Sequence, residues 1–143
     1  MKLKLMFLTG LIIGIVVLIA LRTLGTVNTN QKNAASPSQA TAIEEAKQHG
    51  QPAWLLFHST TCESCIEMEK TYEALKPEFT GKVAFINIDV NDPKEKQLLE
   101  QYKITSIPAI YFQDFKGKIV WKTVGVIPIA EMRAKLQALA AGK

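Results

Sequence analysis

The stretch AWLLFHSTTCESC, residues 53–65, joins an apolar run to the only two cysteines of the chain. Ala53–His58 is continuously apolar and lies between turn-forming residues, which predicts a short strand buried on both faces. Apolar side chains recur at helical spacing over residues 63–76, so a helix is predicted there. The segment therefore predicts a strand, a short loop and a helix, with Cys62 and Cys65 at the amino-terminal end of that helix.

This placement of the cysteines favours sulfur chemistry. Residues three positions apart on a helix are neighbours, roughly 5–6 Å apart, which suits a disulfide. Free backbone N–H groups and the positive end of the helix dipole favour a thiolate at Cys62. Because the thiolate is the attacking form, the sequence predicts a redox pair with Cys62 as its nucleophile.

Two other interpretations of the pair remain open on the sequence alone. A passive disulfide between Cys62 and Cys65 would close so small a loop that it would add little stability. Half of a metal site would need more ligands, for which the other soft candidates are His49 and His58. Covalent haem attachment needs a CxxCH motif, and Ile66 follows Cys65. No metal and no cofactor are predicted.

Helical and strand-like patterns alternate on either side of this stretch. A capping box with Thr41 and Glu44 predicts the start of the first helix, and Asn91 or Asp92 is expected to cap the third. The DFKGK segment predicts a hairpin turn. Helices are expected over Thr41–His49, 63–76, Pro93–Tyr102 and Ile129–Ala140, and strands over Ala53–His58, Val83–Asp89, Ala109–Phe112 and Ile119–Thr123. The order predicts an α/β fold, a mixed central sheet covered by helices on both faces.

The amino-terminal residues predict a membrane segment. Leu5–Leu21 carries no charge, and about 17 apolar residues are enough to span a bilayer. A cleavable signal peptide is the alternative, although its apolar core is usually shorter, about 7–15 residues. Residues 1–26 are therefore expected to form a transmembrane anchor or an uncleaved signal, 27–40 a flexible linker and 41–143 the folded domain. A slim excess of positive charge before Leu5 favours a domain outside the cytoplasm, in the periplasm or at the cell exterior.

The charge of the chain argues against a nucleic-acid partner. Its formal net charge is +4, from 17 Lys and Arg against 13 Asp and Glu. Lys2, Lys4 and Arg22 lie in the first 26 residues, which hold no acid, so the remainder is close to neutral. A near-neutral domain has no electrostatic attraction to phosphate backbones.

Four segments in order resemble the thioredoxin family, in its membrane-anchored extracytoplasmic form. They are LLFHSTTCESC (55–65), FINIDVN (85–91), YKITSIPAIYF (102–112) and FKGKIVWKTVG (115–125). The resemblance implies a thioredoxin-like fold and a thiol–disulfide oxidoreductase in which Cys62 attacks and Cys65 resolves. It also implies that Pro108 is a cis-proline over the cysteine pair. The alternative is an ordinary proline at a strand start, where its missing N–H donor is tolerated. Thr61, Ile107, Pro108 and Gly125 are the implied substrate-binding residues.

The sequence departs from the family where the resolving thiol must lose a proton. Leu56 stands where thioredoxins proper place a buried acid, and Phe85 stands where that acid has a lysine partner. Glu63, Glu67, His58 or solvent would then handle the proton, while plain packing is the other interpretation of His58. Thr61 replaces a tryptophan, and Glu63-Ser64 replace Gly-Pro.

The expected activity is reduction of protein disulfides outside the cytoplasm. A carboxylate at Glu63 opposes thiolate formation at Cys62, which makes the disulfide a weaker oxidant. The resemblance further suggests a membrane thiol-electron transporter as the electron donor, and cytochrome maturation as one use. A disulfide-forming oxidase or isomerase, and a binding module without turnover, are the alternatives.

Overall fold

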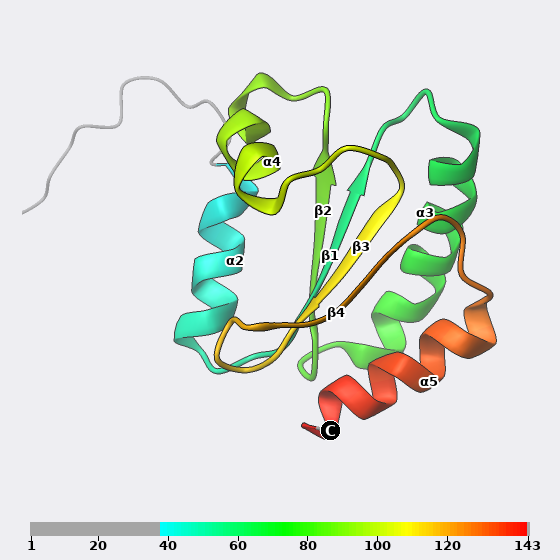
Figure 1. Cartoon of the computed structure of the whole chain (residues 1–143). Helices are drawn as coiled ribbons and strands as arrows, with labels where there is room; N and C mark the ends of the chain where they lie inside the picture. The colour runs from blue at the N-terminus through cyan, green and yellow to red at the C-terminus, as the bar shows by residue number, and fades with distance from the viewer. Residues whose placement is uncertain (1–37, 143) are drawn as a thin grey trace, which may run out of the picture. The chain divides into compact units, whose positions relative to one another are not determined.

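A computed structural model describes residues 38–142 of the chain (Figure 1). The elements in chain order are α2 (Gln39–Gln48), β1 (Ala53–His58), α3 (Glu63–Leu75), η1 (Lys76–Phe79), β2 (Ala84–Asp89), η2 (Pro93–Glu95), α4 (Lys96–Tyr102), β3 (Ala109–Gln113), β4 (Ile119–Val124) and α5 (Ile129–Ala140), the two η segments being 3₁₀ turns. The predicted order of helices and strands is confirmed throughout this range.

The four strands form one mixed sheet in the order β2-β1-β3-β4. β1 pairs with β2 in parallel and with β3 antiparallel, and β3 pairs antiparallel with β4. β1 is therefore a central strand, and all six of its residues are buried, as its continuous apolar sequence predicts. Asp114 accepts backbone N–H bonds from Lys116 and Lys118 through Oδ1, which closes the predicted turn between β3 and β4.

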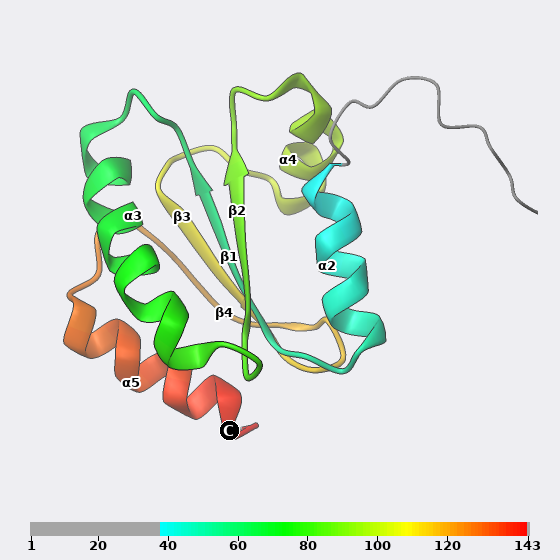
Figure 2. The ribbon, with the colours of Figure 1, turned by 180° about the vertical axis from the view of Figure 1, so that it is seen from behind.

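Helices cover both faces of the sheet. α3 and α5 lie on one face and α2 and α4 on the other, as the opposite views of Figures 1 and 2 both show. Alternate residues of β1 supply the two cores: Leu56 belongs to the α3/α5 side, and Leu55 and Phe57 to the α2/α4 side. The prediction of an α/β fold with both faces covered is confirmed.

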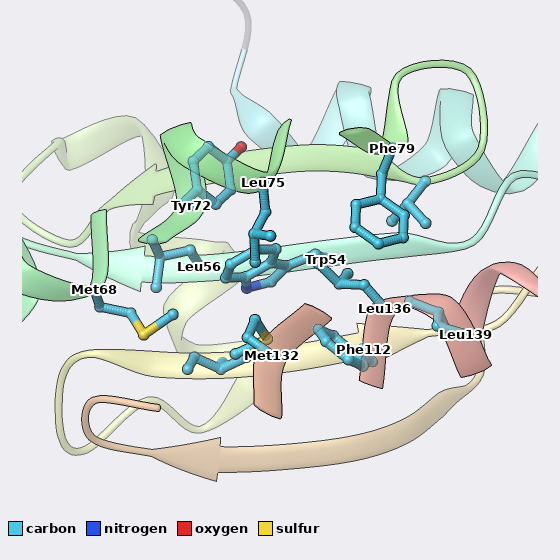
Figure 3. Close-up of a cluster of buried hydrophobic side chains, with 12 residues drawn as sticks. Trp54, Leu56, Met68, Tyr72, Leu75, Phe79, Phe112, Met132, Leu136 and Leu139 are labelled. Carbon is cyan, nitrogen blue, oxygen red and sulfur yellow. The ribbon is translucent and has the colours of Figure 1, made fainter. Parts of the chain in front are cut away.

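The core under α3 and α5 is built around Trp54. Its ring packs against Tyr72 at a centroid distance of 5.0 Å, with Phe85 at 5.1 Å and Phe112 at 6.1 Å. Figure 3 shows the indole between Leu75 of α3 and Met132 of α5. These contacts fix α3, and with it the cysteine pair, against the strands.

The start of α2 differs from the prediction. The helix begins at Gln39, and Ser38 caps it by accepting a hydrogen bond from the Ala40 amide. Thr41 lies inside the helix instead of at its cap. The cause is a tertiary contact, since the buried Glu95 carboxylate accepts bonds from the Gln39 amide and the Ser38 hydroxyl, each 2.9 Å long. The last residues of the predicted linker are thereby helical.

The predicted third helix begins as a 3₁₀ turn. Asp92 caps this turn by accepting a bond from the Lys94 amide, and the α-helix follows from Lys96. The cap at Asp92 is confirmed.

The predicted membrane segment, residues 1–26, and most of the predicted linker lie outside the described residues. Within residues 38–142, none of the helices combines the length and the apolar character that a bilayer crossing requires.

Candidate functional site

Cys62 occupies the N-cap position of α3. Its backbone is extended, with φ −98° and ψ 117°, and its carbonyl accepts the first helical bond from Ile66. The Cys62 sulfur is half-buried, whereas Cys65 is fully buried one turn further on. Both thiols are free, so the structure represents the reduced pair. The predicted position of the pair at the strand-to-helix junction is confirmed.

The two thiols have opposite tendencies to ionise. Hydrogen bonding from the Cys65 thiol, and then from the Ser64 hydroxyl 3.3 Å from the Cys62 sulfur, lowers the pKa of Cys62. Burial, followed by the same thiol–thiol hydrogen bond, raises the pKa of Cys65 to about 11. At neutral pH the half-buried Cys62 thiol is therefore the better nucleophile, and the buried Cys65 thiol holds its proton. The predicted roles of Cys62 as nucleophile and Cys65 as resolving residue require such a difference.

The loop from β1 to α3 is held by the buried Ser59. Its hydroxyl lies 3.0 Å from that of Thr61 and accepts a 2.7 Å bond from the Asn91 side chain. Its carbonyl accepts a bond from the Cys62 amide. Asn91 follows β2, so this link joins the loops after both parallel strands beside the cysteines.

The register of the sheet gathers the other predicted residues at the same end. Phe57 pairs with Ala109, which places Pro108 next to the end of β1. Ala109 also pairs with Val124, so Gly125 follows on the far side. The Gly125 amide donates a 2.9 Å bond to the Pro108 carbonyl.

The Ile107–Pro108 peptide is cis, as the family resemblance implies. Pro108 is buried, and Ile107 before it is half-buried. Gly125 has a φ of +105°, which side chains with a Cβ rarely adopt, and a Cβ there would meet no atom within 4 Å. The space into which a Cβ of Gly125 would project is therefore open.

The proposed proton-handling residues differ in their surroundings. Glu63 is exposed in the first turn of α3. His58 is buried, and its Nδ1 finds no hydrogen-bond partner within the part of the chain that the structure describes. His49 lies at the end of α2, where its ring bonds the Glu45 carbonyl. Within residues 38–142, His, Cys, Asp and Glu form no cluster of three that would hold a metal ion.

A polar pair under α3 escaped the sequence analysis. The Asn87 side chain of β2 donates a 3.1 Å bond to the carboxylate of Glu69. Glu69 follows Cys65 by four residues and acts on it as a like charge that contributes to its raised pKa. A carboxylate one helical turn after the resolving cysteine was the available signal.

Comparison with known proteins gives a consistent picture. The family model described as a thioredoxin-like domain matches residues 39–140. The chloroplast thioredoxin-like protein HCF164 of Arabidopsis thaliana is 30% identical over 106 residues, which are 74% of this chain and 41% of that protein. The thiol:disulfide interchange protein TxlA of Synechococcus elongatus is 26% identical over 133 residues, 90% of this chain and 70% of that protein.

The extent of these matches differs between relatives. The chain spans less than half the length of the plant relatives, 41% and 49% in Arabidopsis and rice. Among solved structures, a thioredoxin-2 of the malaria parasite protein secretion machinery matches with a TM-score of 0.56 and 14% identity, over 61% of this chain and 82% of that one. This last likeness concerns the fold alone.

Proposed function

The chain belongs to the thioredoxin-like family, and on that premise we propose that it exchanges disulfides with other proteins through Cys62 and Cys65. The observation that carries this proposal is the geometry of the pair, with a half-buried Cys62 at the N-cap of α3 and a fully buried Cys65 one turn further on. The lowered pKa of Cys62 and the raised pKa of Cys65 agree with it. The name of TxlA as a thiol:disulfide interchange protein supports the same activity.

The proposed reaction has two steps. The Cys62 thiolate attacks a partner disulfide, one partner sulfur leaves with the electron pair, and a mixed disulfide forms. Cys65 then attacks the Cys62 sulfur, which releases the second partner thiol and leaves a Cys62–Cys65 disulfide. The partner is reduced and this protein is oxidised. The backbone at Ile107, and Gly125, whose Cβ position faces open space, would receive an extended partner segment beside Thr61.

We propose reduction as the physiological direction. Glu63 places a carboxylate in the first turn of α3, and a negative charge beside Cys62 disfavours its thiolate and hence the reduced form. The hydrogen bonds that lower the pKa of Cys62 favour its thiolate and so act against the effect of Glu63. The redox potential of the Cys62–Cys65 pair shows which effect is larger. A potential near the strongly oxidising value of about −120 mV would favour a disulfide-forming oxidase or isomerase instead.

The location is part of the proposal. Leu5–Leu21, uncharged and apolar, would anchor the domain to a membrane with the cysteines outside the cytoplasm. A membrane thiol-electron transporter would then return electrons to the pair, and keeping haem-binding cysteines reduced during cytochrome maturation is one use. Resistance of the full chain to alkaline extraction from membranes, and protease sensitivity from the outer side, would test anchor and orientation.

The experiment that tests the activity is reduction of insulin disulfides by the full chain and by Cys62→Ser. We expect turnover by the natural chain with a dithiol donor and none by the variant. Equal inactivity of both would favour a binding module without turnover. Cys65→Ser, purified without reductant, should carry its natural partners as mixed disulfides on Cys62 and so identify them.

A further inference from the structure

Glu69 is held in a defined place between α3 and β2. Its side chain is half-buried, and one carboxylate oxygen accepts the 3.1 Å bond from the Asn87 amide. Asn87 itself pairs in register with Leu56, and the strand residues around it alternate so that its side chain points under α3. The carboxylate is therefore tethered toward the sheet, although a surface glutamate ordinarily extends into water.

The side chains that β1 and β2 contribute to the core under α3 are apolar. Trp54, Leu56 and Phe85 are the strand side chains of that core, and α5 contributes Met132 from the other side. The Asn87 carbonyl oxygen is buried and has no partner among the described residues.

Cys65 needs a proton acceptor when it attacks. Its thiol is fully buried and has a pKa of about 11, so very little thiolate exists at neutral pH. The attack on the mixed disulfide must therefore remove the thiol proton as the new S–S bond forms. Glu69, four residues after Cys65, lies on the same face of α3.

Other ionisable groups near this end of the sheet have different settings. Cys62 is the sulfur under attack and cannot accept the proton in this step. His58 ends β1, buried and with an Nδ1 that has no partner among the described residues, and is the competing proton acceptor. Asp89, opposite it in register on β2, already accepts a bond from the Asn91 amide. Glu63 and Glu67 are exposed on α3. Glu69 is the carboxylate whose charge acts on Cys65.

We propose that Glu69, positioned by Asn87, accepts the proton of Cys65 directly or across one water when Cys65 resolves the mixed disulfide. The inference rests on the proposed disulfide exchange and deepens it. In this step the Cys65–Cys62 bond forms, the bond from Cys62 to the partner sulfur breaks, the partner thiolate leaves with the electron pair, and the proton passes to the carboxylate. Reduction of the pair by a donor returns the proton to Cys65.

The two steps separate with Ellman's reagent, which carries two thionitrobenzoate groups. With reduced protein in excess, the first release reports attack by Cys62 and depends on protein concentration. The second release reports attack by Cys65 on the mixed disulfide, and its rate is independent of concentration. Glu69→Gln is the test variant, and Glu73→Gln is the control, the same change at an exposed position one turn along α3.

We expect Glu69→Gln to slow the second release by about tenfold or more while the first release keeps its rate, because general-base assistance is typically worth about 10²–10⁴-fold. The difference in second-release rate between Glu69→Gln and the natural chain should become smaller as the pH is raised, since hydroxide then removes the Cys65 proton. Glu73→Gln should match the natural chain, and Asn87→Ala should slow the second release in the same manner as Glu69→Gln.

A faster second release in Glu69→Gln would be equally informative. Removing a like charge lowers the pKa of Cys65, so a purely electrostatic Glu69 would make the second release faster in Glu69→Gln. A faster or unchanged second release overturns the proposal, as does a deficit that is the same at every pH. Failure of the proposed function looks different, because the natural chain would then not reduce insulin disulfides, whatever the rate of the second release.

Discussion

The backbone amide of Gly125 donates a 2.9 Å hydrogen bond to the carbonyl oxygen of Pro108. This bond continues the pairing of β3 with β4 beyond the Ala109–Val124 pair. Pro108, just before β3, and Gly125, just after β4, therefore lie next to each other at the end of the sheet that holds the cysteines. The positions of Pro108 and Gly125 in the site thus depend on one strand register.

Replacing Gly125 by Ala tests this relationship. The φ of +105° is unfavourable for any residue with a Cβ, so we expect Gly125→Ala to lower the free energy of unfolding by about 1–3 kcal/mol, measured by urea unfolding. A Cβ at Gly125 would project into the open space that a partner protein is proposed to occupy. Insulin reduction should therefore slow more than the reaction of Cys62 with a small disulfide. Equal losses with both substrates would argue against a partner-binding role.

The pH dependence of alkylation tests the asymmetry of the thiols. Cys62 should react with iodoacetamide below the ordinary pH range of a thiol, because hydrogen bonds from Cys65 and Ser64 favour its thiolate. Cys65→Ala should raise the pKa of Cys62, and Ser64→Ala should raise it by less. In Cys62→Ser, Cys65 should still react only at a pH above the ordinary range of a thiol, because burial, the largest cause of its raised pKa, is retained. An unshifted profile in both alanine variants would contradict this account of the site.

Asn91→Ala tests the link between the two loops. Losing the 2.7 Å bond to the buried Ser59 hydroxyl should cost about 0.5–1.5 kcal/mol of unfolding free energy. The first thionitrobenzoate release should also slow, because the Cys62 amide bonds the carbonyl of Ser59. Thr60→Ala, in an exposed position of the same loop, is the control and should change neither quantity.

Two substitutions at Trp54 test the core that supports α3. Trp54→Ala should cost about 3–5 kcal/mol of unfolding free energy, as large-to-small changes in packed cores do. Trp54→Phe should cost clearly less, because it keeps an aromatic ring among Tyr72, Phe85 and Phe112 and removes an indole N–H that has no partner among residues 38–142. Equal costs in chemical denaturation would show that ring contacts are not what stabilises this core.

The local pattern of the sequence determined the elements and the place of the cysteines. Six successive apolar residues predicted a strand buried on both faces, and β1 is that strand. The helical spacing after Cys62 predicted α3, and Gly117 in the segment after β3 predicted the hairpin. These features depend on neighbouring residues, whose pattern follows from the periods of a helix and a strand.

Only the tertiary structure decided the contacts between distant segments. The Glu69–Asn87 bond joins residues 18 positions apart, the Asn91–Ser59 bond 32 and the Gln39–Glu95 bond 56. No periodicity within one element encodes such partners, because they meet only after the strand order and register are set. For that reason the sequence placed the first turn of α2 two residues late and gave no sign that Asn87 would hold Glu69 between α3 and β2.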